Sequence, residues 1–420
     1  MKPTASTALA LVIAASAAPA AAQYGSYGSS PPQQPAQTTP QAAPDATKAT
    51  IQPSKKAVKA IVDLQTAVTN KDVANIPAKL AAAQALAETK EDRYLIARLQ
   101  LQAAAGANDN AAMETAIAAV AASNYLDAGR LSDLYVALGG TYYKGKLYPQ
   151  AAAAFQKALA INPQNRDAGT MTAEALLGAG QKAEAAAAFQ RLIQARSAGG
   201  QKPEENLFKR AVAVAYEAKS PAAIDLARQW VAAYPTPSSW SDSIAIYRNL
   251  NLGDAEATLD LLRLKQTLGI LSAPEYAALA GAATDQLIFD EAQSVLDAGL
   301  AAKKIDPASA SGRDLIGVLK VKAKPTAADL GEAMKVAANG KALMRIGDNY
   351  AALGDYAHAV EAYKLAMAKP DGDPAVANLH IGMALARSGD KAGATAALNA
   401  VTGPRAEIAK YWLTYLAQKS

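Results

Sequence analysis

Two glycine-rich segments of this 420-residue chain come close to nucleotide-binding motifs. Residues 140–147 read GTYYKGKL, but a phosphate-binding loop needs Ser or Thr after its lysine to hold magnesium, and Leu147 stands there. Residues 178–183 read GAGQKA and imitate a dinucleotide fingerprint, yet no predicted strand precedes them. Both segments are better explained as helix and turn, so we expect no nucleotide cofactor.

Other candidates for catalysis or metal binding are equally sparse. The two histidines, His358 and His380, each lack a second His or Glu at zinc-ligand spacing, so we expect them on a surface or lining a groove. The chain has no cysteine and no G-x-S-x-G nucleophile motif. The acidic pairs 204–205 and 290–291 lie at predicted helix starts, where negative charge favours the helix dipole. We therefore predict no enzyme activity, no metal and no cofactor.

The composition indicates the elements that must carry any site. Apolar residues make up 51% of the chain but aromatic residues only 6%, and about half of the apolar residues are alanine, the strongest helix former. No alternating runs typical of strands occur. The net charge of +5 is spread along the chain without a basic stripe, so we expect no nucleic-acid partner.

The first 53 residues have the pattern of an export signal and a tether. Lys2 precedes the apolar run 8–15, Pro19 breaks it, and small residues at 20–22 precede Gln23, which predicts a signal peptide over 1–22. Residues 23–53 are rich in Pro, Gln and Ser and are predicted to be a disordered linker. The protein is then periplasmic or secreted. No later segment contains an apolar run long enough to predict an integral membrane span.

From residue 54 to 420 the chain is predicted to be helical, with breaks at Gly-Asp, Asn or Pro every 12 to 20 residues. Two AAAAFQ segments place Phe155 and Phe189 34 residues apart, which indicates a repeated helical hairpin. Residues 132–165 carry the fullest pattern of aromatic, small and proline positions, namely Tyr135, Leu138, Gly139, Tyr142, Ala151, Phe155, Ala158 and Pro163.

This pattern resembles the tetratricopeptide repeat, whose hairpins stack into an α-solenoid. Further copies are predicted at 166–199, 340–373 and 375–402, and a capping helix at 404–418. Between these copies the match weakens. The sequence is compatible with one continuous solenoid or with two arrays that join near residue 310.

The resemblance implies a concave groove lined by the first helices of the repeats. Lys341 and Arg345, four residues apart on such a helix, would there hold the terminal carboxylate of a partner. Asp348, Val136 and Tyr143 are the other candidate groove residues. The asparagines that complete the family's carboxylate clamp are missing from neighbouring units, so a solvated basic face is the alternative.

Three functions remain open at this point. A scaffold or adaptor in the cell envelope that binds another protein or peptide is the first. The second is a module that binds cell-wall or exported polysaccharide, with aromatic side chains such as Tyr143 stacking on sugars. The third is an enzyme whose catalytic residues are dispersed along the solenoid.

Overall fold

The computed structural model describes residues 51–251 and 254–419, and these residues form 21 α-helices, one short 3₁₀-helix and no strand. The prediction of an all-α repeat fold is therefore confirmed. The predicted signal peptide, 1–22, and residues 23–50 of the predicted linker lie outside the described residues. None of the described helices is long and apolar enough to cross a bilayer.

The chain divides into two compact units, with the boundary after Ala175 in α7. The joint considered near residue 310 falls inside the second unit. The helices of the first unit are α1 Val58–Thr69, α2 Ile76–Leu86, α3 Lys90–Gly106, α4 Asn110–Ala122, α5 Ala128–Lys144, α6 Tyr148–Ile161 and most of α7 Arg166–Gly178.

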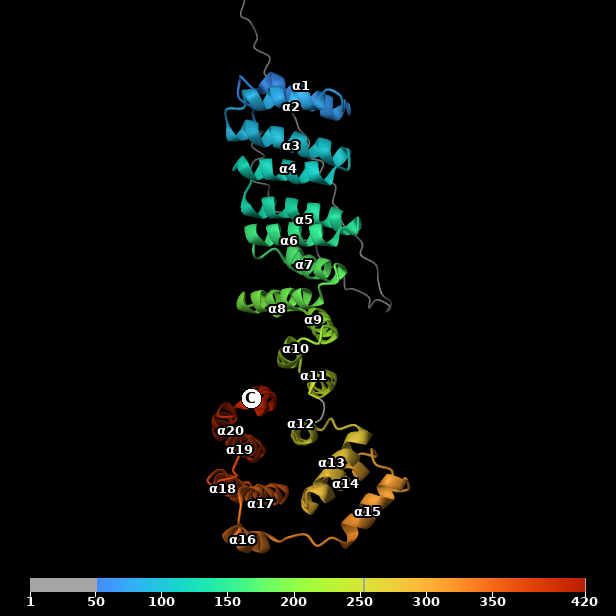
Figure 1. Cartoon of the computed structure of the whole chain (residues 1–420), viewed down its shortest axis with the longest axis vertical. Helices are drawn as coiled ribbons and strands as arrows, with labels where there is room; N and C mark the ends of the chain where they lie inside the picture. The colour runs from blue at the N-terminus through green and yellow to red at the C-terminus, as the bar shows by residue number, and fades with distance from the viewer. Residues whose placement is uncertain (1–50, 252–253, 420) are drawn as a thin grey trace, which may run out of the picture. The chain divides into compact units, whose positions relative to one another are not determined.

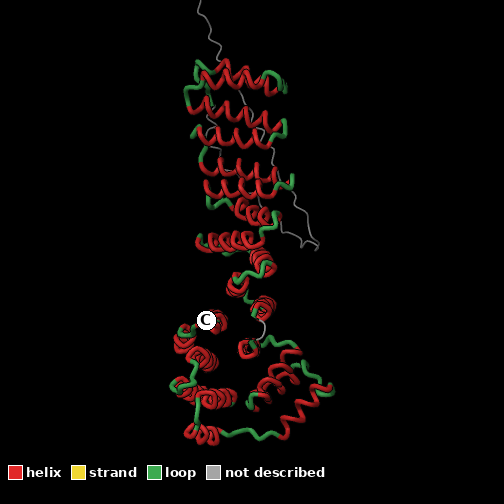
Figure 2. The backbone as a smooth tube through the Cα atoms, viewed as in Figure 1, coloured by secondary structure: helices red, strands yellow, loops and turns green. Residues whose placement is uncertain are grey.

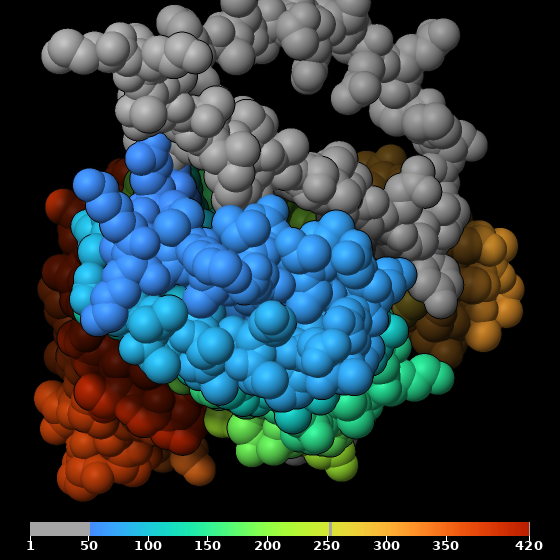
Figure 3. Space-filling view, turned by 90° about the horizontal axis from the view of Figure 1, so that it is seen from above, coloured from blue at the N-terminus to red at the C-terminus, as the bar shows by residue number. Residues whose placement is uncertain are grey.

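The helices of the first unit lie as successive antiparallel hairpins (Figures 1 and 2). Figure 3 shows the N-terminal end of this unit, where the side chains of its first helices form a closely packed surface. The best hairpin, α5 with α6, is held by the fully buried ring of Phe155. A Cβ atom at Gly139 would lie 2.6 Å from that ring, so this position requires glycine. The aromatic residue and the glycine of the repeat therefore have a direct packing reason.

The second unit contains the remaining helices. They are α8 Lys182–Ala198, α9 Glu205–Glu217, α10 Ala222–Ala233, α11 Pro237–Leu250, α12 Ala255–Leu268, α13 Ala273–Asp285, α14 Phe289–Ala301, α15 Ala310–Val321, α16 Ala327–Val336, α17 Gly340–Ala352, α18 Tyr356–Met367, α19 Pro374–Ser388, α20 Lys391–Asn399, η1 Gly403–Arg405 and α21 Ala406–Gln418.

Two hairpins of this unit repeat the packing seen around Phe155. A Cβ atom at Gly347 in α17 would lie 2.4 Å from the ring of Tyr363 in α18. At Gly382 in α19, it would lie 2.5 Å from Leu398 in α20. The glycine of the first helix thus admits the large side chain of the second helix in each case.

The Gly-Asp turns end one helix and start the next, as predicted. Gly354 and Gly389 adopt φ angles of 78° and 89°, a left-handed conformation that glycine tolerates best. The following residues, Asp355 and Asp390, are N-caps, and their carboxylates accept backbone N–H groups three residues later. Short turns of this kind force consecutive helices to run antiparallel.

The second unit closes on itself through α21. This helix packs on the preceding α19 and α20 but also contacts α10 and α12 (Figure 1). Tyr411 of α21 donates a hydrogen bond to the carbonyl of Ser243 at 3.0 Å, and Gln418 donates to the carbonyl of Val231 at 3.2 Å. A helix that only capped the last repeat would make none of these contacts with α10 and α11.

The closure leaves α12 enclosed by the other helices. All seven residues from 259 to 265 are buried. Leu261 and Leu264 belong to the apolar core shared with α10, α11 and α19–α21, whereas Leu259 and Leu262 belong to the core with α13–α15. A helix that is covered on every side has no solvated face for its charged residues, which must find partners inside the protein.

Candidate functional site

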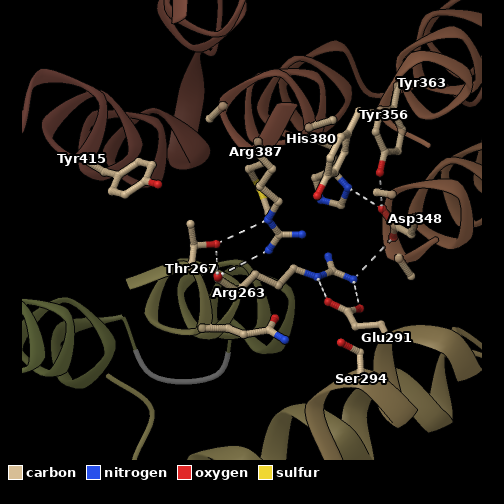
Figure 4. Close-up of a pocket in the computed structure, with 16 residues that line it drawn as sticks. Arg263, Thr267, Glu291, Ser294, Asp348, Tyr356, Tyr363, His380, Arg387 and Tyr415 are labelled. Atoms are coloured by element: carbon tan, nitrogen blue, oxygen red, sulfur yellow. Dashed lines mark hydrogen bonds and ion pairs between the residues drawn. The ribbon is translucent and has the colours of Figure 1, made fainter. Parts of the chain in front are cut away.

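Three polar residues of α12 form one stripe along the helix. Asp260, Arg263 and Thr267 follow each other at i, i+3 and i+7, so they share a face. That face is turned toward α14, α17 and α19, where side chains of opposite charge meet it (Figure 4). We call Asp260, Arg263, Glu291, Asp348 and His380 the charge cluster.

Arg263 is the centre of the charge cluster, and its side chain is only 5% exposed. Its guanidinium donates to both carboxylate oxygens of Glu291, at 2.8 and 2.7 Å, in a bidentate arrangement. It also donates to Asp260 at 3.3 Å and lies 3.7 Å from Asp348. Arginine suits this position because its planar fork matches carboxylates from several directions.

His380 bridges two carboxylates on the other side of the charge cluster. Its Nδ1 lies 2.8 Å from Asp348, and its Nε2 lies 3.2 Å from Asp260. Tyr363 also donates its hydroxyl to Asp348, at 2.7 Å. The helices α12, α17, α18 and α19 are thereby joined through one set of polar contacts.

The electrostatics of the charge cluster fix its protonation. Burial alone would lower the pKa of His380, but the neighbouring Asp348 and Asp260 outweigh burial and raise it to about 10. Burial would raise the pKa of Asp348, yet His380 and Arg263 lower it to about 2. Burial and then the Asp348 charge raise the pKa of Tyr363 well above its usual range. At neutral pH the imidazole is a cation and the carboxylate is ionised.

Two cavities flank the charge cluster. The Arg345 cavity, of about 590 Å³, lies beside the N-terminal half of α12 and is lined by Glu256, Leu259, Asp260, Arg263, Gln286, Ile288, Gly340, Lys341, Met344, Arg345, Asp348, Asp371, Gly372, Asp373, Val376 and His380. The Arg387 cavity, of about 350 Å³, lies beside the C-terminal half of α12. It is lined by Arg263, Gln266, Thr267, Glu291, Ser294, Asp348, Ala351, Ala352, Tyr356, Tyr363, His380, Met383, Ala384, Ala386, Arg387 and Tyr415 (Figure 4).

Three of the five candidate groove residues lie together. Lys341 and Arg345 are exposed side chains of α17 that line the Arg345 cavity, and Asp348 lies one turn further along the same helix. Val136 and Tyr143 belong to α5 in the first unit and line neither of these cavities. Tyr143 is half-buried and packs edge to face on Tyr148, with ring centroids 5.3 Å apart.

Sequence reasoning missed most of the charge cluster. Glu291 does lie in the first turn of α14, as expected, but it also binds Arg263. His380 lines both cavities, in agreement with the expectation of a groove position, although it is buried. The available signal was in α12 itself, where leucines surround Asp260 and Arg263 and indicate that both charges are buried.

Metal chemistry has no support among the described residues, which hold no group of three or more His, Cys, Asp or Glu arranged to bind an ion. The charge cluster is instead a closed set of ion pairs. Both oxygens of Glu291 are occupied by Arg263, and Asp348 is held by His380 and Tyr363. Carboxylates engaged in this way are poorly placed to exchange protons with a substrate.

Comparison with protein families now adds to the geometry. Two tetratricopeptide-repeat models match the sequence, at residues 144–197 and 340–368. The chain therefore contains tetratricopeptide repeats. The second match covers α17 and α18 completely, so Lys341, Arg345 and Asp348 lie on the first helix of a tetratricopeptide hairpin. No curated protein sequence matches the chain.

Solved structures with helical repeats are similar only at low scores. The TPR2AB domain of yeast Sti1 in its pHSP90 complex is 14% identical, with a TM-score of 0.25, over 69% of this chain and 96% of that domain. A tetratricopeptide repeat protein from Parabacteroides merdae is 12% identical, with a TM-score of 0.25, over 70% of this chain and 99% of the other. The Naa15/Naa10 structure bound to HypK-THB is 14% identical, with a TM-score of 0.30, over 87% of this chain and 59% of the other.

Proposed function

We propose that this tetratricopeptide-repeat protein is a non-enzymatic scaffold of the cell envelope that binds a protein or peptide partner in the Arg345 cavity. The repeat family supports protein binding in general. The observation that carries the choice of cavity is the state of its charged groups. Those groups divide into acids and bases that already have partners and two exposed bases that form no ion pair among the described residues, although the backbone N–H of Gly340 and the charge of Lys341 both lower the pKa of Asp371.

The acidic residues at the Arg345 cavity have partners within the chain. Asp373 accepts the N–H groups of residues 375 and 376 as the N-cap of α19. Asp371 accepts the backbone N–H of Gly340 at 2.7 Å. Glu256 pairs with Arg405 at 3.0 Å. Asp260 and Asp348 belong to the charge cluster.

Lys341 and Arg345 differ from these acids. Both side chains are exposed, both line the cavity, and neither forms an ion pair within the described parts of the chain. Two cations one helical turn apart suit a carboxylate, which accepts charge-assisted hydrogen bonds from both. The partner is therefore expected to offer an acidic side chain or a C-terminal carboxylate.

The test uses short acidic peptides with a free C-terminus and the same peptides with an amidated C-terminus. Fluorescence anisotropy should show tighter binding of the free acids. Replacing Arg345 with Glu should weaken binding roughly ten- to hundredfold, which is the loss of one charge-assisted contact of about 1.5–3 kcal/mol. Circular dichroism should show unchanged helicity, because the side chain is exposed.

Arg313→Glu is the matched control, because it makes the same charge change on an exposed residue of α15 that lines neither cavity. Peptide affinity should be the same as that of the unmodified protein. If both variants lost affinity equally, the effect would come from the net charge of the protein, and the assignment of peptide binding to the Arg345 cavity would be refuted. Affinity capture from envelope fractions, with glycan beads in parallel, would then separate protein partners from polysaccharide.

The envelope location rests on the N-terminal pattern alone. The small residues at 20–22 favour cleavage between Ala22 and Gln23. N-terminal sequencing of the protein recovered from the envelope or the medium should begin at Gln23. Recovery in the cytoplasm with Met1 retained would contradict this part of the proposal.

A further inference from the structure

The Arg387 cavity contains a cation that the chain itself does not neutralise. Arg387 lies on α19 and makes no ion pair with any described residue. Its Nε and one terminal nitrogen approach Thr267 Oγ1 and the carbonyl of Arg263, both at a long 3.4 Å. Its guanidinium also lies 5.8 Å from the centre of the Trp412 ring. These contacts hold the group in place without satisfying its charge.

The remaining terminal nitrogen of Arg387 is directed away from Thr267, toward the space between Arg263 and His380 (Figure 4). All three residues line the same cavity. The guanidinium therefore presents free N–H donors to the cavity interior. A side chain that is positioned by weak contacts on one edge and free on the other is preorganised to bind an acceptor.

The acids of this cavity do not compete for that position. Among the described residues, Glu291 and Asp348 are the carboxylates that line it, and both are engaged by Arg263 or His380. Arg263 and His380 are in turn paired with these two carboxylates and with Asp260. Arg387 is therefore the lining cation that has no ion-pair partner among the described residues.

Several uncharged polar groups of the wall are able to donate hydrogen bonds. Tyr356, Tyr415 and Ser294 offer hydroxyls, and Gln266 offers an amide. Within the described residues, none of these four side chains has a hydrogen-bonding partner. A volume of about 350 Å³ is at the small end of the range of ligand sites. The cavity is thus suited to a small molecule rather than to a folded partner.

We propose that the Arg387 cavity binds a small-molecule carboxylate, whose oxygens accept hydrogen bonds from Arg387 and from the hydroxyl groups of the wall. The ligand is either a free organic acid or an acidic sugar, since both offer the same carboxylate. The two cavities share Arg263, Asp348 and His380 in their walls, but the cations that carry the two proposals, Arg387 and Arg345, each line one cavity alone, so variants of these two residues test the proposals separately.

Isothermal titration with the full chain tests the proposal. The probes are succinate and glucuronate, with succinamide and glucose as uncharged counterparts, all at one ionic strength. The acids should bind saturably and the uncharged counterparts should not. Saturation by glucuronate alone would identify an acidic sugar, and saturation by succinate alone a free organic acid. Equal binding of acids and uncharged compounds, or no saturation by any acid at millimolar concentration, would overturn the proposal.

Variants locate the site. Arg387→Gln should lower the affinity for the acid roughly ten- to hundredfold, and Tyr356→Phe, which keeps the ring, roughly two- to tenfold. Arg313→Gln, on an exposed residue that lines neither cavity, is the matched control and should leave this affinity unchanged. If Arg387→Gln fails to fold, Tyr356→Phe still decides the question. Loss of acid binding in Arg345→Gln but not in Arg387→Gln or Tyr356→Phe would assign the carboxylate to the Arg345 cavity and refute this inference.

Discussion

Replacing Arg263 with Met removes the central cation of the charge cluster while keeping a side chain of similar length. The perturbation leaves Asp260 and Asp348 with His380 as their remaining ion-pair partner, and it leaves Glu291 with none among the described residues. Glu291 suffers most, because both of its oxygens lose their donors. A carboxylate stranded in this way must lose its charge or pull water into the core.

The magnitude follows from burial. Arg263, Asp260 and Glu291 have side chains 5%, 4% and 8% exposed, so solvent screens their interactions weakly. Breaking a buried ion pair by removing one partner costs about 3–5 kcal/mol. For a unit of this size, 1 kcal/mol corresponds to about 2–4 °C in Tm. We expect the Tm of the second unit to fall by roughly 6–20 °C.

Thermal unfolding followed by circular dichroism and by calorimetry measures the effect. Arg313→Met is the control, because Arg313 is exposed, and its Tm should change little. The double variant Arg263→Met with Glu291→Leu should recover part of the loss, since replacing both partners leaves no stranded charge on Glu291. A single variant as stable as the Arg313 control would refute the account of the charge cluster as an interdependent set of buried charges.

Three further expectations concern pH and packing. The pKa of His380 is raised from 6.5 to about 10 in the fold, so the stability that its protonated form contributes is complete below pH 6.5 and is lost as pH rises through about 10. Urea titrations across that range should show the free energy of unfolding decline with pH. The variant His380→Gln should show a smaller dependence on pH. Phe155→Ala should cost about 3–5 kcal/mol by chemical denaturation, because the ring is fully buried against Gly139, and an unaffected protein would contradict the repeat register. Gly347→Ala should destabilise the protein, because the added Cβ atom would meet the ring of Tyr363. Gly317→Ala, within α15 and with no atom near its Cβ, should instead stabilise the protein by about 0.5–1 kcal/mol. Equal Tm shifts in the two variants would contradict the packing argument.

The sequence predicted the fold because its decisive signals are local. The 34-residue spacing of Phe155 and Phe189, the Gly-Asp turns and the alanine-rich helices each depend on residues close in the chain. The placement of Lys341 and Arg345 on one helix face follows from the same kind of signal, since the two residues lie four positions apart on α17. The closeness of Asp348 to these two residues follows from the same helix.

The charge cluster could not be predicted in the same way. Arg263, Glu291 and Asp348 meet only because α12 is enclosed by helices from distant repeats. That enclosure depends on α21 reaching α10, a contact between residues almost two hundred positions apart. Repeat periodicity describes how each hairpin meets its neighbour, and it carries no information on where the array meets itself.

The contact of α21 with α10 and α11 also constrains how the protein is made. In an ordinary solenoid each hairpin can fold on its predecessor as soon as it is synthesised. Here the apolar faces of Trp240 and Ile244 share one core with Trp412 of α21. These faces therefore stay uncovered until residues 406–418 have left the ribosome, and the second unit can complete its core only from that moment.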